Sequence, residues 1–108
     1  MISFEDFKKL DLRVAKILSV EEIPGKDKLY ILELSVGDLG ERKIFAGIKP
    51  FYSREQLLGK KIIIASNLAP KKLGALVSEG MLLAVPIPEG KFEVVFVSDS
   101  LPEGARLE

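Results

Sequence analysis

Residues 67–81, with the sequence NLAPKKLGALVSEGM, gather side chains that could bind a polyanion. Asn67 is the only asparagine of the chain and offers an amide, and Lys71 and Lys72 offer positive charge. The small residues around them would let backbone N–H groups approach a phosphate. The same features also fit an ordinary surface loop, in which lysines are solvated and an asparagine amide satisfies backbone groups. Residue type alone leaves binding and local structure both open.

Catalytic chemistry has few side chains to use in this chain. There is no histidine and no cysteine, which excludes Ser-His-Asp and Cys-His catalysis and zinc sites built on imidazole or thiolate. Carboxylate pairs and a Ser-Lys pair remain open, but no spacing singles one out. We therefore expect a protein that is not an enzyme, with no cofactor and no metal site.

The composition is that of one soluble globular domain covering residues 1–108, because 47% of the residues are apolar and 30% are charged. The longest apolar runs, such as MLLAVPI at residues 81–87, are too short to cross a membrane. The N-terminus has early acidic residues and no apolar segment. We therefore expect no signal peptide, no membrane partner and a cytoplasmic location.

The charges are balanced overall but unevenly distributed along the chain. Lys and Arg total 16, as do Asp and Glu, so the formal net charge is zero. Residues 51–80 hold five basic and two acidic side chains, whereas residues 81–108 hold two basic and five acidic ones. This asymmetry allows a positive face on a neutral molecule. Binding to a nucleic acid is compatible with it, but strong nonspecific binding to DNA is not expected.

Six segments have the composition of β-strands, because they are rich in Val, Ile and Leu and are bounded by turn-forming residues. They are residues 11–23, 29–36, 42–48, 61–66, 81–87 and 92–97. In the first, the alternation slips phase near Ala15, which predicts a β-bulge. We expect a turn at residues 24–28, a glycine-rich connection at 37–41, a long loop at 67–80 and an irregular tail after residue 97.

Two capping boxes predict short helices. Ser53 with Gln56 places one between the third and fourth strands, and Ser3 with Asp6 begins an added N-terminal helix. The apolar residues on one face of the N-terminal helix are Phe4, Phe7 and Leu10. Three strands, a helix and two strands is the order of the OB-fold. We predict an all-β OB-fold, a five-stranded barrel with a C-terminal strand extension. An SH3-like barrel is the competing prediction, which the helix disfavours.

An OB-fold binds its ligands around strands two and three and the loops that join strands one–two and four–five. Those loops would be residues 24–28 and the segment 67–80, and both contain lysines. Tyr30 and Phe45 are aromatic candidates for stacking, although Phe45 lies in an apolar run typical of a core. A single-strand binder would be expected to have more aromatic residues. Recognition of a folded RNA by shape and backbone is therefore favoured.

Five ordered blocks of the sequence resemble a known family. They are LDLRVAKI (10–17), DKLYILELSVG (27–37), GIKPFYSREQLLGKKIII (47–64), NLAPKKL (67–73) and SEGMLLA (78–84). Together they are similar to the tRNA-binding domain, the OB-fold module at the C-terminus of many bacterial methionyl-tRNA synthetases. The same module occurs as free-standing dimeric proteins and as separate beta subunits of archaeal synthetases.

The resemblance implies non-catalytic binding to the elbow, or outer corner, of tRNA with little sequence preference. It also implies a homodimer, formed through the N-terminal residues 3–10 and the C-terminal extension, roughly residues 92–106. Position by position, the implied tRNA-binding residues are Lys28, Arg42, Asn67, Lys71, Lys72, Ser78, Glu79 and Met81. Ala69 and Gly74 stand where the family commonly has basic residues, and Lys71 compensates in part. For Met81, packing in the core is an equally good interpretation.

Two kinds of function remain open from the sequence. The first is a tRNA-binding protein that acts free-standing or as a beta subunit aiding methionyl-tRNA synthetase. The second is a protein-binding module, because one branch of the family resembles a secretion-related chaperone that binds unfolded peptide. The NLxP and SEGM motifs favour the first, and an exposed apolar groove without a basic rim would favour the second.

Overall fold

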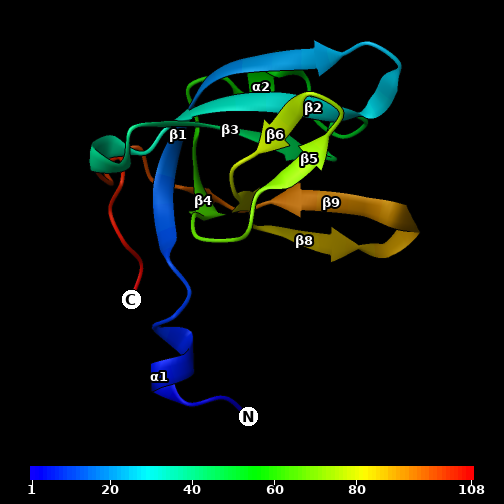
Figure 1. Ribbon diagram of the computed structural model, residues 1–108. Coiled ribbons are helices and arrows are strands. Elements are labelled where there is room, and N and C mark those ends of the chain that lie inside the picture. Colours follow the sequence, from blue (N-terminus) through cyan, green and yellow to red (C-terminus); the bar gives the residue numbers. More distant parts are fainter.

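The computed structural model describes all residues from 1 to 108 and is dominated by β-structure (Figure 1). In chain order, the elements are α1 (Phe4–Phe7), β1 (Leu12–Ile23), β2 (Lys26–Ser35), the 3-10 helix η1 (Gly37–Leu39), β3 (Glu41–Ala46), α2 (Arg54–Leu57), β4 (Lys61–Ala65), β5 (Lys71–Leu73), β6 (Leu76–Ser78), β7 (Met81–Leu82), β8 (Ala84–Ile87), the 3-10 helix η2 (Pro88–Gly90), β9 (Lys91–Val94) and β10 (Phe96–Val97). This is the predicted OB-fold, with α2 between β3 and β4. No helix is both long and apolar enough to cross a membrane.

Strand β1 organises the barrel because it pairs with two different strands. Its residues 12–16 lie antiparallel to β4, and from Lys16 onward it lies antiparallel to β2. The register shifts between Ile17 and Ser19, so the bulge lies at Leu18 and not near Ala15 as predicted. Ala15 pairs regularly with Ile62. The bulge instead follows the point at which β1 changes partner, where extra twist helps a sheet to curl.

The two predicted capping boxes are both present. The Ser3 hydroxyl accepts a hydrogen bond from the Asp6 N–H, and the Ser53 hydroxyl accepts one from the Gln56 N–H, with the reciprocal side-chain bonds also made. The helix α2 buries Leu57 against the barrel. By contrast, α1 stands away from the barrel in Figure 1, and Phe4 is 68% exposed. Within the chain, its apolar face borders only the end of the tail, with which Phe4, Phe7 and Leu10 line a pocket of about 270 Å³.

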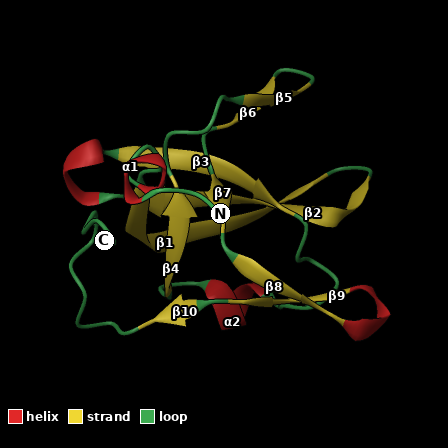
Figure 2. Cartoon of the chain, turned by 90° about the horizontal axis from the view of Figure 1, so that it is seen from below, coloured by secondary structure: helices red, strands yellow, loops and turns green.

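The segment predicted as a long loop contains a β-hairpin. Strands β5 and β6 pair antiparallel across a turn at Gly74, whose φ of +61° suits glycine. Figure 2 shows this hairpin standing away from the barrel. The prediction missed it because its strands are only three residues long and mostly exposed, so they lack the alternation that marks a half-buried strand.

The predicted fifth and sixth strands are each divided. Residues 81–82 pair with β4, whereas residues 84–87 turn away and pair with β9. The change occurs at Leu83, whose N–H donates to the Ile63 carbonyl and whose carbonyl accepts from the Val95 N–H. After Val95 the chain returns to the barrel as β10, which pairs with the other end of β4. A continuous apolar run does not reveal such an exchange of partners.

The C-terminal tail, which we expected to be irregular, is held against β1. Val14 donates its N–H to the Ala105 carbonyl, and the Gly104 N–H donates to the Val14 carbonyl. The tail also lies close to Gly37, just after β2. Glycine is needed there, because a Cβ at that position would lie 2.2 Å from the Glu103 carbonyl oxygen. The tail is thus part of the domain and not a loose extension.

The core fills the barrel between β1, β2, β3 and β4, and β3 closes the barrel against the end of the β5–β6 hairpin. The fully buried large side chains are Ile17, Leu32, Leu34, Val36, Ile44, Leu57, Ile62 and Ile64. The Glu79 N–H donates to the Lys43 carbonyl at 2.8 Å, and the Phe45 N–H donates to the Ser78 hydroxyl at 2.9 Å. The segment that carries most of the predicted binding residues is therefore fastened directly to β3.

Candidate nucleic-acid interface

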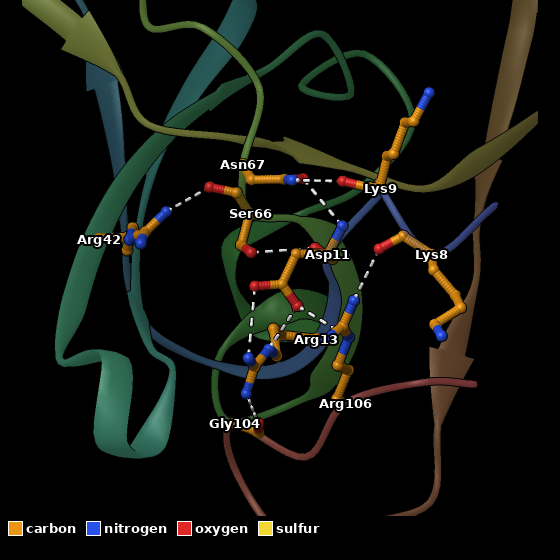
Figure 3. Close-up of polar contacts among 9 residues, drawn as sticks. All are labelled: Lys8, Lys9, Asp11, Arg13, Arg42, Ser66, Asn67, Gly104 and Arg106. Carbon is orange, nitrogen blue, oxygen red and sulfur yellow. Dashed lines mark hydrogen bonds and ion pairs between the residues drawn. The ribbon is translucent and has the colours of Figure 1, made fainter. Parts of the chain in front are cut away.

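Asn67 fastens the base of the hairpin segment to the chain between α1 and β1. Its Oδ1 accepts a hydrogen bond from the Asp11 N–H at 2.8 Å, and its Nδ2 donates to the Lys9 carbonyl at 2.7 Å (Figure 3). The preceding Ser66 adds a bond from its hydroxyl to the Asp11 carbonyl at 2.9 Å. The side-chain amide and carbonyl groups of Asn67 are thus engaged by the protein's own backbone, although the residue is exposed.

Below Asn67 lies an ion-pair cluster in which one carboxylate holds two guanidinium groups. Asp11 Oδ1 lies 2.7 Å from Arg13 Nε and 3.4 Å from Arg106 Nε. Arg13 also donates to the Gly104 carbonyl, and Arg106 to the Lys8 carbonyl (Figure 3). The hydrogen bond from Arg13, aided by the charges of both arginines, lowers the pKa of Asp11 below its usual value. This cluster ties together the start of the chain, β1 and the tail.

Arg42 fastens the segment 66–79 from the side of β3. Its Nη1 donates to the Ser66 carbonyl and, at 3.5 Å, to the Glu79 carbonyl. The Glu79 carboxylate accepts a bond from the Lys43 N–H at 3.4 Å. Ser78 is buried, and its hydroxyl accepts from Phe45 and donates to the Gly80 carbonyl at 3.2 Å. Arg42, Ser78 and Glu79 therefore all help to hold the segment in position.

A groove lies between the β5–β6 hairpin and the barrel, which we call the hairpin groove. Its volume is about 410 Å³. It is lined by Leu29, Phe45, Gly47, Leu68, Ala69, Lys71, Lys72, Leu73, Ser78, Gly80 and Met81. No acidic residue is among them. The lining thus combines an apolar surface with two cationic side chains.

The structure divides the predicted tRNA-binding residues into three groups. Four of them line the hairpin groove, namely Lys71, Lys72, Ser78 and Met81, and Lys28 directly precedes the lining residue Leu29. Arg42 and Glu79 line a separate pocket by the start of β3, where Glu33, Glu41 and Lys43 complete the lining. Asn67 lies at the base of the hairpin beside Asp11. The set is therefore spread over an extended surface.

The cationic side chains of this surface differ in exposure and in whether they already make bonds within the protein. Lys28, Lys71 and Lys72 are exposed, and none of them forms a salt bridge within the chain. Arg42 is half-buried and already donates to two backbone carbonyls. The three lysines thus provide the free positive charge, and Arg42 shapes the surface that carries them.

A family model described as "Putative tRNA binding domain" matches residues 12–106. The chain belongs to this family. The methionine–tRNA ligase of Listeria monocytogenes serovar 1/2a is 44% identical over 107 residues, which is 99% of this chain but 16% of the ligase. The domain therefore spans about one sixth of the length of such curated relatives.

Two solved structures resemble this tRNA-binding domain over almost their whole length. A MetRS related protein from Pyrococcus horikoshii superimposes with a TM-score of 0.93 at 33% identity, covering 100% of this chain and 98% of that one. The chaperone CsaA from Bacillus anthracis str. Ames gives a TM-score of 0.87, also at 33% identity, covering 100% and 99%. Both likenesses agree with the OB-fold and the family predicted from the sequence.

Two features of this tRNA-binding domain were missed from the sequence. Phe45 was expected to be more typical of the core, but it is half-buried and lines the hairpin groove. The Asp11–Arg13–Arg106 cluster was not foreseen. The spacing of Asp11 and Arg13 was its one signal, because residues i and i+2 of an extended chain point to the same side. Tyr30 is buried, and its hydroxyl donates to the Tyr52 carbonyl.

Proposed function

We propose that this domain binds folded tRNA at the elbow, without catalysis, by recognising shape and backbone. The observation that carries the proposal is the hairpin groove, whose lining has two unpaired lysines and no acid. A cationic surface that is not neutralised by neighbouring carboxylates attracts phosphates. Belonging to the tRNA-binding domain family supports tRNA as the polyanion.

The number of free lysines limits how strongly charge alone can hold the RNA. Lys28, Lys71 and Lys72 could each neutralise one phosphate and release its counterions. Three such contacts on a molecule of zero net charge give weak, salt-dependent binding. A second copy of the domain on the same RNA would add avidity.

We also propose that two copies associate through α1 and the C-terminal extension. The exposed aromatic side chains of these segments support this arrangement. Phe4 stacks on Phe7 at the end of the chain that stands away from the barrel, and both Phe92 and Phe96 are exposed on the extension. Apolar surface of this kind is typical of protein–protein interfaces.

Similarity to part of a methionine–tRNA ligase and to a MetRS related protein supports a role next to aminoacylation. We propose that the domain acts either free-standing or as a subunit that aids methionyl-tRNA synthetase. In both cases it would raise the local concentration of tRNA, and the chemistry would be performed elsewhere.

The direct test is titration with unfractionated tRNA at low and moderate salt, with single-stranded DNA and an unfolded protein as competitors. We expect binding that weakens with salt and that neither competitor displaces. Lys72→Ala should weaken binding and lower the slope of log K against log salt by about 1, because one phosphate contact is lost. Lys91→Ala, which removes an exposed lysine of β9, is the matched control. Absence of tRNA binding at low salt would refute the proposal.

Peptide binding is a second candidate, because the domain resembles the chaperone CsaA. A second groove supports it. Its volume is about 280 Å³, and apart from Gly47 it is lined by apolar side chains, including Leu83 and Phe92. Retention of the unfolded protein without any retention of tRNA would favour this function over the first.

A further inference from the structure

The hairpin groove has the size and lining of a site for a small, partly apolar anion. Its volume of about 410 Å³ lies within the range of roughly 300–1,000 Å³ that is common for pockets that hold organic ligands. Phosphate contacts alone would not need such a concavity, because lysines on a flat surface could make them. The groove therefore has room for a contact beyond the phosphate backbone.

The apolar part of the groove is formed by side chains that can pack on a flat ring. Met81 is 51% exposed, Leu68 is 41% exposed, and Phe45 is half-buried. Two of them, Phe45 and Met81, also line the second groove, so the apolar surface continues beyond the hairpin. A nucleobase is apolar on its faces and can pack against aromatic or aliphatic side chains regardless of its identity.

The charges of the groove select between a nucleic acid and a peptide. Lys71 and Lys72 border the apolar surface, and no carboxylate is present to balance them. An apolar peptide side chain would use the apolar surface of the groove but neither of its positive charges. A nucleotide brings an apolar face and a phosphate together, which matches the lining on both counts.

We propose that the hairpin groove holds one unstacked base of the bound RNA, with the adjoining phosphates on Lys71 and Lys72. The proposal rests on the proposed binding of tRNA and names a part of the RNA that this surface contacts. Contact through the face of a base explains how such a site could act on many tRNAs, because every base has that face.

Gly47 allows the groove to be blocked without disturbing the barrel. Its φ is not positive, and a Cβ built on it would meet only the Leu29 side chain, at 3.9 Å. A larger side chain here would therefore occupy the hairpin groove or the adjoining second groove, both of which Gly47 lines, without backbone strain. Gly80, which also lines the groove, is unsuitable, because its φ is +137° and a Cβ would lie 2.9 Å from the Ala65 carbonyl oxygen.

The first experiment measures tRNA affinity across a range of salt concentrations for Gly47→Leu and Met81→Ala. We expect each to weaken binding about tenfold, as the loss of one base contact does. The salt slope should stay unchanged, because no phosphate contact is removed. Leu58→Ala is the matched control, since Leu58 is 49% exposed and lies at the end of α2, outside the groove.

The second experiment uses the methionine methyl groups as reporters by NMR. The chain has two methionines, of which Met81 lines the groove and Met1 is the first residue. On addition of tRNA we expect the Met81 methyl resonance to move upfield, because a base stacked on it exerts a ring current. The Met1 resonance should not move in that way and serves as the internal control.

The outcomes separate this inference from the proposed function. If tRNA binds in a salt-dependent manner but Gly47→Leu and Met81→Ala bind as tightly as the unaltered protein, the base contact is refuted while tRNA binding stands. An unshifted Met81 methyl in the saturated complex refutes it equally. If the unaltered protein binds no tRNA, both the proposed tRNA binding and the proposed base contact are refuted. A Met81 shift with an unfolded protein and none with tRNA would refute the base contact and would favour peptide binding at the apolar surface that the two grooves share.

Discussion

At the scale of single residues, the side chain of Asn67 stabilises the protein itself, because both of its polar groups are bonded to the backbone. Its amide supplies an acceptor to Asp11 and a donor to Lys9, two backbone groups that are more than 50 residues away in the chain. These bonds fix the point at which the hairpin segment leaves β4. Lys72 differs from Asn67, because its side chain provides positive charge but makes no salt bridge within the protein.

We expect Asn67→Ala to lower the free energy of unfolding by about 1–2 kcal/mol, because two backbone groups lose their partner. Urea denaturation would measure the loss. Lys72→Ala is the contrasting variant and should leave stability within about 0.5 kcal/mol, since the side chain is exposed and unpaired. Together, the two substitutions should weaken tRNA binding while the domain stays folded. Equal stability of Asn67→Ala and the unaltered protein would show that these bonds are replaced by water without cost.

Asp11 makes the stability of the domain depend on acidity. Arg13 holds the pKa of Asp11 below its value in the unfolded chain. The carboxylate therefore stabilises the fold fully above the usual aspartate range, and this contribution fades as the pH falls below about 4.

We expect Asp11→Asn to be less stable than the unaltered protein at pH 7, and the difference to shrink at pH 3. Thermal unfolding at both pH values measures it. Glu22→Gln is a suitable comparison, because the pKa of Glu22 is also lowered, here by Lys49, but the carboxylate is largely exposed and should matter less. A difference that stayed constant with pH would argue against a role for the charge of Asp11.

At the scale of elements, the β5–β6 hairpin depends on the barrel for its position. Its two strands pair only with each other. Ser78 and Glu79 fasten one end to β3, and Asn67 fastens the other to the α1–β1 junction. The shape of the hairpin groove therefore depends on those few hydrogen bonds, because they hold the hairpin in place against the barrel.

We expect Ser78→Ala to lower the free energy of unfolding by about 1–3 kcal/mol, because the Phe45 N–H, at a partly buried position, loses its acceptor. The same change should weaken tRNA binding although Ser78 need not touch RNA. Amide hydrogen exchange of Phe45 would report the loosened junction, and Leu58→Ala, at an exposed position at the end of α2, is the control. Unaltered exchange at Phe45 would mean that another group closes the barrel there.

The sequence predicted features that local rules determine. Both capping boxes and the place of α2 were correct, because a cap depends on residues three positions apart. A bulge in β1 was predicted, but near Ala15 and not at Leu18, because its place follows the change of strand partner at Lys16. The break at Leu83 was not predicted, because it too depends on strand partners. The partners of Asn67 and the tail's contact with Gly37 lie far away in the chain, so no short window could reveal them. Of the site, the lysines were recognisable by type, but the groove beside them was not.

At the scale of the whole molecule, the exposed apolar residues of α1 and the extension make association of two copies the expected state. We expect light scattering at micromolar concentration to give the mass of a dimer. Phe4→Ser should shift the protein toward the monomer and reduce tRNA affinity, because avidity is lost. Leu58→Ala, which alters exposed apolar surface elsewhere, should do neither. A clean monomer for the unaltered protein would remove this part of the proposal.

The pinning of the tail beside β1 also determines how this domain can be joined to others. Leu107 donates to the Leu12 carbonyl in antiparallel fashion, so the chain enters and leaves the barrel side by side at one edge. A neighbouring domain attached after residue 108 would start beside the entry of β1, whereas one attached before residue 1 would be separated from that entry by α1. Such a module can be appended to an unrelated enzyme, or carried as a separate chain, without rebuilding the barrel.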